Sequence, residues 1–389
     1  MYRPSPYEKL QTLFAEGKEL SDKERLAFAY GPLLHWYQEN GRKLPWRENK
    51  DAYRIWISEI MLQQTRVEAV KPYFARFMEH FPTVTALADA PEDELLKCWE
   101  GLGYYSRARN LKKAAEIVVE KHGGKLPASH EELLALPGIG SYTAGAIASI
   151  AYEIPAPAVD GNVLRVLSRV TGIRDDILKL STKKKMETLV AEVIREGEAG
   201  DFNQALIEIG AIVCVPNGAP LCETCPFGTV CEARAKGLTG EIPVKTPKKK
   251  RKIEEKTVLL LEYGEKIAIR KRGDEGLLAS LYEFVSVPGK LSEEEVLDLF
   301  GEKAELMKLP DAKHIFSHVE WHMSGYFVSG VQMPDTLAGE STDDLIFAEY
   351  EELKEKYPIP SAFMAYKKYL DQWAEGKSGS QMQKKPRKK

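Results

Sequence analysis

Residues 136–145 read Leu-Pro-Gly-Ile-Gly-Ser-Tyr-Thr-Ala-Gly, a tight turn followed by small side chains. Gly138 and Gly140 allow the backbone to turn sharply, and the small residues after them predict a closely packed helix. The free N–H groups and the dipole at the start of such a helix favour an anion, for example a DNA phosphate. A glycine turn before a helix is also a common structural feature, so this stretch alone leaves both interpretations open.

Two acidic residues lie on either side of this turn in the sequence. Asp160 follows a proline-rich stretch and precedes a helical pattern. Its side chain therefore has either a purely structural role, as the N-cap of that helix, or a functional role as a carboxylate. Glu59 lies in residues 56–65, Trp-Ile-Ser-Glu-Ile-Met-Leu-Gln-Gln-Thr, on one helix face with Gln63 and among apolar neighbours that raise a carboxyl pKa. A lone glutamate there is usually solvated. As a pair, however, the two carboxyls suit glycosidic bond cleavage, in which one protonates the leaving group and the other stabilises a sugar cation.

Four of the five cysteines lie in one short segment, at positions Cys214, Cys222, Cys225 and Cys231. In a reducing compartment this spacing indicates metal ligation rather than disulfides. The segment contains one Cys-x-x-Cys pair, whereas a zinc ribbon uses two, so the spacing favours a [4Fe-4S] cluster over structural zinc. The remaining cysteine, Cys98, is predicted to be a packing residue on an apolar helix face.

Composition predicts a soluble protein of at least two domains. The chain has 389 residues, of which 43% are hydrophobic and 29% charged, and its net charge of −3 excludes a global positive field for nucleic acid. The charged N-terminal segment is unlike a secretory signal, and no apolar run is long enough to span a bilayer. We therefore expect an intracellular protein, cytoplasmic in a bacterium, with no membrane partner.

Pattern changes along the chain predict four segments. Helical periodicity dominates residues 7–236, which predicts an all-α domain. Residues 237–255 are predicted to be a basic linker. Short β-like runs then predict an α+β domain over residues 256–373, and the polar residues 374–389 predict a basic disordered tail.

Several of these motifs together resemble one known family. They are residues 56–65, 102–110 (Leu-Gly-Tyr-Tyr-Ser-Arg-Ala-Arg-Asn), 136–147 and 159–166, the cysteine segment, and Phe-Ser-His at 316–318. In combination they resemble the A/G-specific adenine DNA glycosylases, the MutY family of the helix-hairpin-helix superfamily, from Leu44 to about His318. The resemblance implies a multidomain fold: an all-α helix-hairpin-helix glycosylase domain with an iron-sulfur cluster loop, plus a C-terminal α+β Nudix-like domain. The chain departs from the family pattern in its first cysteine gap, which is one residue longer.

The resemblance also implies roles for single residues. Glu59 would protonate the adenine ring and Asp160 would face the sugar cation, with hydrogen-bond support from Tyr142 and Asn162. The other implied DNA or base contacts are Arg47 and Glu208 in the adenine pocket, Gln64, Leu102 and Tyr104 as wedges in the duplex, Gly138 and Gly140 at a phosphate, and Phe316, Ser317 and His318 at 8-oxoguanine. The implied cluster ligands are Cys214, Cys222, Cys225 and Cys231.

One position bears on the reaction products. Members of the superfamily that also cut the strand have a lysine, which forms a Schiff base with the sugar, where this chain has Tyr142. The resemblance therefore implies a monofunctional glycosylase that acts, as a monomer, on double-stranded DNA with adenine opposite 8-oxoguanine or guanine and leaves an abasic site. The second domain lacks the glutamate-rich Nudix motif, so we do not expect it to hydrolyse free nucleotides.

Three alternatives remain open from the residues. An enzyme of the endonuclease III family would share the cluster. A catalytically silent module would keep the hairpin and the Phe-Ser-His loop and would bind the lesion without releasing a base. A redox protein would use the cluster for electron transfer, although no Gly-x-Gly-x-x-Gly motif follows a predicted strand.

Overall fold

The computed structural model describes residues 19–247, 250–301, 303–337 and 340–382. Some parts of the predicted segments lie outside the described residues: 7–18 of the helical domain, 248–249 of the linker, 302 and 338–339 of the second domain, and 383–389 of the tail. The described chain divides into two compact units, the first with residues 19–89 and 110–247 and the second with residues 90–109 and 250–382. None of its helices is both long enough and apolar enough to cross a membrane.

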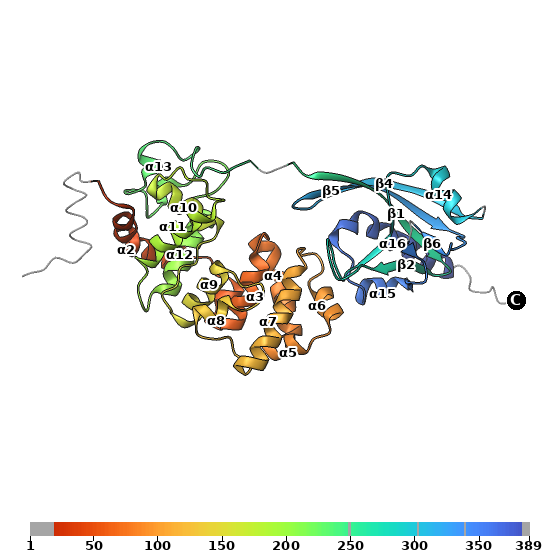
Figure 1. The fold of residues 1–389 in the computed structure, drawn as a ribbon, viewed down its shortest axis with the longest axis horizontal. Coiled ribbons are helices and arrows are strands. Elements are labelled where there is room, and N and C mark those ends of the chain that lie inside the picture. The colour runs from red at the N-terminus through yellow and green to blue at the C-terminus, as the bar shows by residue number, and fades with distance from the viewer. Residues whose placement is uncertain (1–18, 248–249, 302, 338–339, 383–389) are drawn as a thin grey trace, which may run out of the picture. The chain divides into compact units, whose positions relative to one another are not determined.

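Helices make up the first unit (Figure 1). In chain order they are α2 (Asp22–Asn40), η1 (Pro45–Arg47), α3 (Ala52–Leu62), α4 (Val67–His80), α5 (Val84–Asp89), α7 (Ser106–His122), α8 (His130–Leu134), α9 (Ser141–Tyr152), α10 (Gly161–Thr171), α11 (Leu180–Ala191), α12 (Ala199–Ile212), η2 (Cys222–Thr224) and α13 (Glu232–Ala235). The first turn of α7, up to Arg109, belongs to the second unit, as does α6 (Glu92–Cys98).

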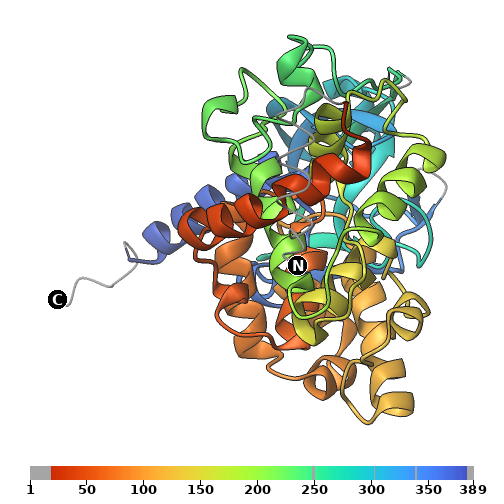
Figure 2. The same cartoon turned by 90° about the vertical axis from the view of Figure 1, so that its left-hand side faces the viewer.

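Glycines allow the central helices of the first unit to pack closely. α12 lies beside α2, α9 and α10, and the two views both show α2 alongside it (Figures 1 and 2). A Cβ added to Gly210 of α12 would lie 2.7 Å from the Cβ of Asn162 on α10. A Cβ added to Gly145 of α9 would lie 2.0 Å from the carbonyl oxygen of Pro157. The small residues of α9 therefore bring this helix against the segment that leads to Asp160.

Substitution of Gly145 by alanine is expected to destabilise the protein by roughly 1–3 kcal/mol, because the backbone at Pro157 blocks the new methyl group. Denaturant unfolding measures this loss. The matched control is Gly31→Ala in the interior of α2, where an added Cβ meets nothing within 4 Å. Alanine there should be neutral or stabilising by up to about 1 kcal/mol, because it is the better helix former. Equal effects of the two substitutions would contradict the close packing at Gly145.

The second unit is a sheet with helices on both faces (Figure 1). After α6 its elements are β1 (Lys252–Tyr263), β2 (Lys266–Lys271), β3 (Tyr282–Pro288), α14 (Glu293–Phe300), β4 (Glu305–Ile315), β5 (Val319–Ser329), β6 (Thr336–Leu337), β7 (Glu340–Ser341), β8 (Leu345–Ala348), α15 (Tyr350–Glu355), η3 (Ser361–Phe363) and α16 (Met364–Met382).

Six strands form the main sheet, in the order β4-β5-β1-β3-β2-β8. The β1–β5 pair is parallel and the other neighbouring pairs are antiparallel. One face packs on α15, η3 and α16 through side chains such as Phe363 and Tyr366. The other packs on α14 through Val296 and Phe300. Helices therefore bury both faces, which explains why the central strand β1 has a continuous buried run, Thr257–Leu261.

The elements differ from the sequence expectation at two boundaries. β1 begins at Lys252, within the residues predicted to be a linker. α16 continues to Met382, past Trp373, where the sequence predicts that the packed domain ends. A helix can extend beyond the core on which its first turns pack, because its backbone hydrogen bonds are internal to the helix. The polar composition of residues 374–382 therefore does not locate the end of the helix.

Candidate functional site

A cavity of about 640 Å³ lies within the first unit. Its walls come from α3 and residues 63–67 on one side, and from α9, the start of α10 and α12 on the other. Six of the sequence-predicted site residues line it: Arg47, Glu59, Gln64, Tyr142, Asp160 and Asn162. The two acidic residues, which are about one hundred positions apart in the sequence, thus share one cavity.

Glu59 is a buried carboxyl on α3. The hydroxyl of Tyr142, on the first turn of α9, donates a hydrogen bond of 2.6 Å to its Oε2. Burial raises the pKa of Glu59 to about 7, although the bond from Tyr142 and the nearby charge of Arg47 act in the opposite direction. Close to neutral pH a large share of this carboxyl is therefore protonated and able to give up a proton.

Asp160 is the N-cap of α10 and also lines the cavity. Its Oδ1 accepts from the backbone N–H groups of Asn162 (2.9 Å) and Val163 (2.8 Å), and its Oδ2 accepts from Asn162 Nδ2 (2.9 Å). Burial raises the pKa of Asp160, and these hydrogen bonds oppose that effect. Asp160 accepts three hydrogen bonds, whereas Glu59 accepts one. Because hydrogen bonds to a carboxylate stabilise its charged form, Asp160 is the more easily ionised of the two. The capping role and an electrostatic role are thus compatible in one residue.

Arg165 is a residue near the site that the sequence interpretation missed. Its Nη2 donates to Asn162 Oδ1 (3.0 Å), and its Nε donates to the carbonyl oxygen of Cys214 (2.8 Å). One turn further along α10, Arg169 Nη1 donates to Cys214 Sγ (3.3 Å). One helix therefore connects the Asp160–Asn162 pair to the cysteine segment. The sequence signal was a pair of arginines at i and i+4 in an otherwise apolar helix.

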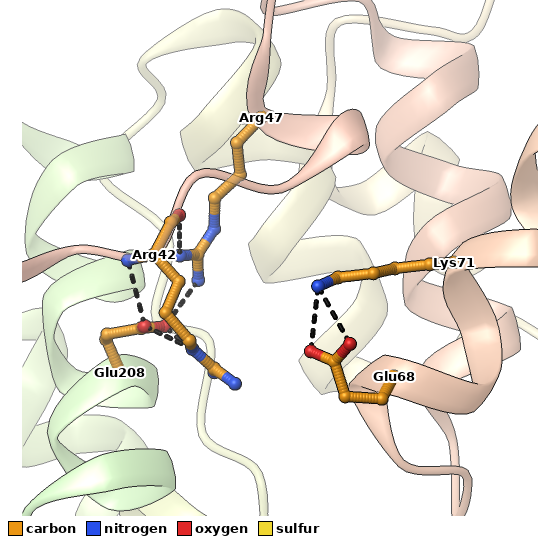
Figure 3. Close-up of polar contacts among 5 residues, drawn as sticks. All are labelled: Arg42, Arg47, Glu68, Lys71 and Glu208. Carbon is orange, nitrogen blue, oxygen red and sulfur yellow. Dashed lines mark hydrogen bonds and ion pairs between the residues drawn. The ribbon is translucent and has the colours of Figure 1, made fainter.

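Glu208 of α12 is fully buried and lies between two arginines (Figure 3). Its Oε1 accepts from Arg42 Nε (2.5 Å) and its Oε2 from Arg47 Nη2 (2.9 Å). Burial raises the pKa of Glu208, but the bonds and charges of Arg42 and Arg47 outweigh it, so the pKa is lowered overall. Both arginines line the cavity, whereas Glu208 lies behind them. Arg42 was not predicted, because no local pattern connects it to a partner 166 residues away.

The glycine turn at residues 136–140 connects α8 to α9. Gly138 has a φ of +77°, and a Cβ added to it would lie 2.8 Å from the Cβ of Asn110. Gly140 is the N-cap of α9, has no side-chain capping bond, and has open space where a Cβ would lie. The N–H groups of the first turn of α9 have no partner within the helix, and Gly140 has no side chain that would keep an anion away from them.

A second cavity, of about 510 Å³, lies within the second unit. It brings together the other sequence-predicted residues of this region, Leu102, Tyr104, Phe316, Ser317 and His318. Tyr104 Oη lies 3.3 Å from Ser317 Oγ. The backbone φ of Tyr104 is +49°, and that of Gln64 in the first unit is +58°. Residues other than glycine rarely adopt positive φ values. Such strained backbone is often found at functional sites.

The four clustered cysteines line one small cavity in the first unit. None of them forms a disulfide in the described residues. Burial raises the pKa of Cys225 to about 12 and also raises that of Cys231. In the described part of the chain, no group of three or more His, Cys, Asp or Glu side chains is arranged to hold a single metal ion.

The raised pKa of Glu59 makes the stability of the fold depend on pH. Below pH 4.5, its ordinary pKa, the carboxyl is neutral in both folded and unfolded chains, and above about 7 it is ionised in both. Between these values the folded chain holds a proton that the unfolded chain has lost, so stability falls as pH rises, by roughly 3 kcal/mol in total. Glu59→Gln should therefore raise the unfolding midpoint at pH 8 and change it little at pH 4.5. The same shift at both pH values would contradict a raised pKa.

Comparisons with known proteins agree with this architecture. Residues 57–196 match the family model of HhH-GPD superfamily base excision DNA repair proteins, and residues 257–369 match a NUDIX domain model. An adenine DNA glycosylase of Buchnera aphidicola is 36% identical over 77% of this chain and 85% of its own length. One of Mus musculus is 32% identical over 90% of this chain and 80% of its own length.

A solved thermostable thymine-DNA glycosylase is 30% identical, with a TM-score of 0.50 over 55% of this chain and 98% of its own. The helical unit, the sheet unit and these matches confirm the predicted fold class. The chain belongs to the adenine DNA glycosylase (MutY) family, whose members are DNA repair enzymes that combine a helix-hairpin-helix glycosylase domain with a Nudix-like domain.

Proposed function

We propose that this chain is a monofunctional DNA glycosylase that hydrolyses the N-glycosidic bond of adenine paired with 8-oxoguanine or guanine in double-stranded DNA. The observation that carries the proposal is the asymmetric carboxyl pair in the 640 Å³ cavity. Glu59 has a pKa of about 7, and Asp160 accepts three hydrogen bonds. An acid and a carboxylate with different surroundings suit cleavage through a cationic sugar.

The reaction that we propose begins when adenine leaves the base stack and enters the cavity. Glu59 gives its proton to a ring nitrogen of adenine, which makes the base a better leaving group. The C1′–N bond breaks with its electron pair going to adenine, and the ionised Asp160 stabilises the oxocarbenium ion. Water then adds to C1′ and releases a proton to the solvent, which leaves an abasic site. Glu59 takes up a proton from the solvent and is ready for the next turnover. Tyr142 and Asn162 hold the two carboxyls in place.

Base recognition is proposed for the arginine pair of the same cavity. Arg42 and Arg47 present guanidinium groups to the space, and Glu208 fixes their orientation from behind. No lysine is among the described residues that line the cavity, which supports hydrolysis rather than Schiff-base strand cleavage. Gly138, Gly140 and the start of α9 are proposed to hold a backbone phosphate, and Gln64 to enter the duplex from this unit.

Recognition of the opposite base is proposed for the second unit. Leu102 and Tyr104 would enter the duplex, and Phe316, Ser317 and His318 would contact 8-oxoguanine. Their shared cavity supports this proposal, as does the approach of Tyr104 to Ser317. Inserted side chains offset part of the few kcal/mol that flipping a base requires.

The four cysteines are proposed to hold a [4Fe-4S] cluster. A cluster separates its thiolates more widely than a single ion does, so four cysteines around one shared cavity suit it. Arg169 donates a hydrogen bond to Cys214 Sγ and so places a positive charge beside one of the proposed ligands. When bound, the cluster would crosslink residues 214–231 and could exchange electrons.

Iron and sulfide analysis of the purified protein tests the cluster. We expect about four irons per chain and a strong loss of iron in Cys225→Ser. The control Cys98→Ser removes a buried cysteine outside the cluster segment and should retain the iron. Zinc in place of iron, or equal iron in both variants, would contradict the assignment.

A single-turnover assay tests the proposed function. The substrates are duplexes with adenine opposite 8-oxoguanine or guanine, or with an oxidised pyrimidine, and products are resolved before and after alkali. We expect breaks at adenine after alkali treatment alone. Breaks at the pyrimidine without alkali would favour an endonuclease III activity, and binding of the lesion duplex with no base release would leave a lesion-binding protein.

A further inference from the structure

The end of the basic segment lies against the Phe316–His318 turn. Sequence composition predicts a solvated linker for residues 237–255, yet Lys252 already begins β1. β1 runs parallel to β5, with Lys252 paired to Val319. Because β5 starts immediately after the turn, the residues before β1 lie beside it.

Two bonds from this segment reach the carbonyl groups of the turn. Arg251 Nε donates to the carbonyl oxygen of Phe316 (3.0 Å), and the N–H of Lys252 donates to that of His318 (3.2 Å). The turn closes on itself through the N–H of Phe316, which donates to the carbonyl oxygen of Val319 (2.9 Å). Both ends of the turn are therefore fixed by backbone groups and by one charged side chain.

In the Phe316–His318 turn, the side chains of Ser317 and His318 are exposed and that of Phe316 is partly buried. The Phe316 ring makes edge contacts with His314 (4.5 Å between centroids) and with the buried Trp321 (4.8 Å). Ser317 and His318 are exposed at the tip. The carbonyl group that accepts from Arg251 belongs to the peptide group between Phe316 and Ser317. The hydrogen bond therefore fixes the orientation of this peptide group, and with it the direction of the Ser317 side chain.

We propose that Arg251 is a positioning residue for lesion recognition: its charged hydrogen bond to Phe316 holds Ser317 and His318 in the orientation that discriminates 8-oxoguanine from guanine. This inference rests on the proposed function of the turn. Without the bond, the Phe316–Ser317 peptide can rotate, and Ser317 Oγ loses its place beside Tyr104 Oη. The Glu59 chemistry belongs to the other unit, so Arg251 acts on recognition and not on bond cleavage.

The test compares full-length wild type, Arg251→Gln and Lys250→Gln. The last variant removes one exposed positive charge from the neighbouring residue and controls for general attraction to DNA. Single-turnover rates are measured against enzyme concentration on duplexes with adenine opposite 8-oxoguanine or guanine. Hydrogen exchange of residues 315–319 in the free proteins reports the order of the turn independently of activity.

For Arg251→Gln we expect the enzyme concentration that gives half of the saturated rate to rise about tenfold more on the 8-oxoguanine duplex than on the guanine duplex. This is the effect expected from the loss of one charged hydrogen bond. The saturated rate should stay the same, and exchange of the turn should accelerate. Lys250→Gln should weaken binding to both duplexes alike. The inference is overturned if Arg251→Gln behaves as Lys250→Gln, or if it lowers the saturated rate on both duplexes. A wild type that releases no adenine from either duplex would refute the proposed function. A wild type that releases adenine equally well from both duplexes would leave the proposed function intact and refute this inference alone.

Discussion

Replacement of Glu59 by glutamine is expected to lower the single-turnover rate of adenine release by roughly 10²–10⁴-fold, the usual contribution of a general acid. Glutamine has nearly the same shape and keeps an oxygen that can accept the Tyr142 hydroxyl, but it has no proton to give to the base. Binding of the lesion duplex should change little. The measurement is the release of free adenine from an 8-oxoguanine duplex at saturating enzyme.

The matched control is Glu68→Gln in the same unit. Glu68 lies on α4, is largely exposed and does not line the cavity. Its carboxylate pairs with Lys71 at 2.7 Å (Figure 3). Its variant should release adenine at the wild-type rate. If Glu59→Gln kept more than about a tenth of the wild-type rate, proton donation by Glu59 would be excluded as a main source of catalysis.

Replacement of Asp160 by asparagine is expected to slow adenine release by roughly 10²–10³-fold, because the charge that stabilises the oxocarbenium ion is lost. The fold should remain, since asparagine is also a good N-cap and its oxygen can accept from the backbone of Asn162 and Val163. The same rate assay measures the effect, and an unfolding curve verifies the fold.

Asp51→Asn is the control for the capping role of Asp160. Asp51 caps α3 by the same device, in which its Oδ1 accepts from the N–H of Arg54 at 2.8 Å, and it does not line the cavity. This variant should retain the wild-type rate. Similar loss of activity in both variants would mean that helix capping, and not the charge of Asp160, explains the effect.

The parts of the site that the sequence predicted are those set by local patterns. The glycine turn before α9 and the N-cap at Asp160 follow from the needs of a few adjacent residues. The clustered cysteines likewise depend on short spacings. The geometry brings Glu59 and Asp160 into one cavity, but their catalytic roles remain predictions until the variants are measured.

The parts that the sequence could not predict depend on contacts between distant segments. Arg42 reaches Glu208 across 166 residues, and Arg251 reaches Phe316 across 65. Strand β4 has no clear sequence pattern, because a register shift between Leu309 and Ala312 breaks the alternation of buried and exposed residues. Pro310 falls in this irregular part of an edge strand, where proline is tolerated.

The pH dependence of kcat/KM for adenine release tests most directly whether Glu59 is an acid with a raised pKa. Because kcat/KM reports the free enzyme, it should fall about tenfold per pH unit above a pKa of about 7, where Glu59 loses its proton. The residual activity of Glu59→Gln should lack this decrease. A kcat/KM that stays constant from pH 6 to 9, or the same decrease in Glu59→Gln, would contradict the account.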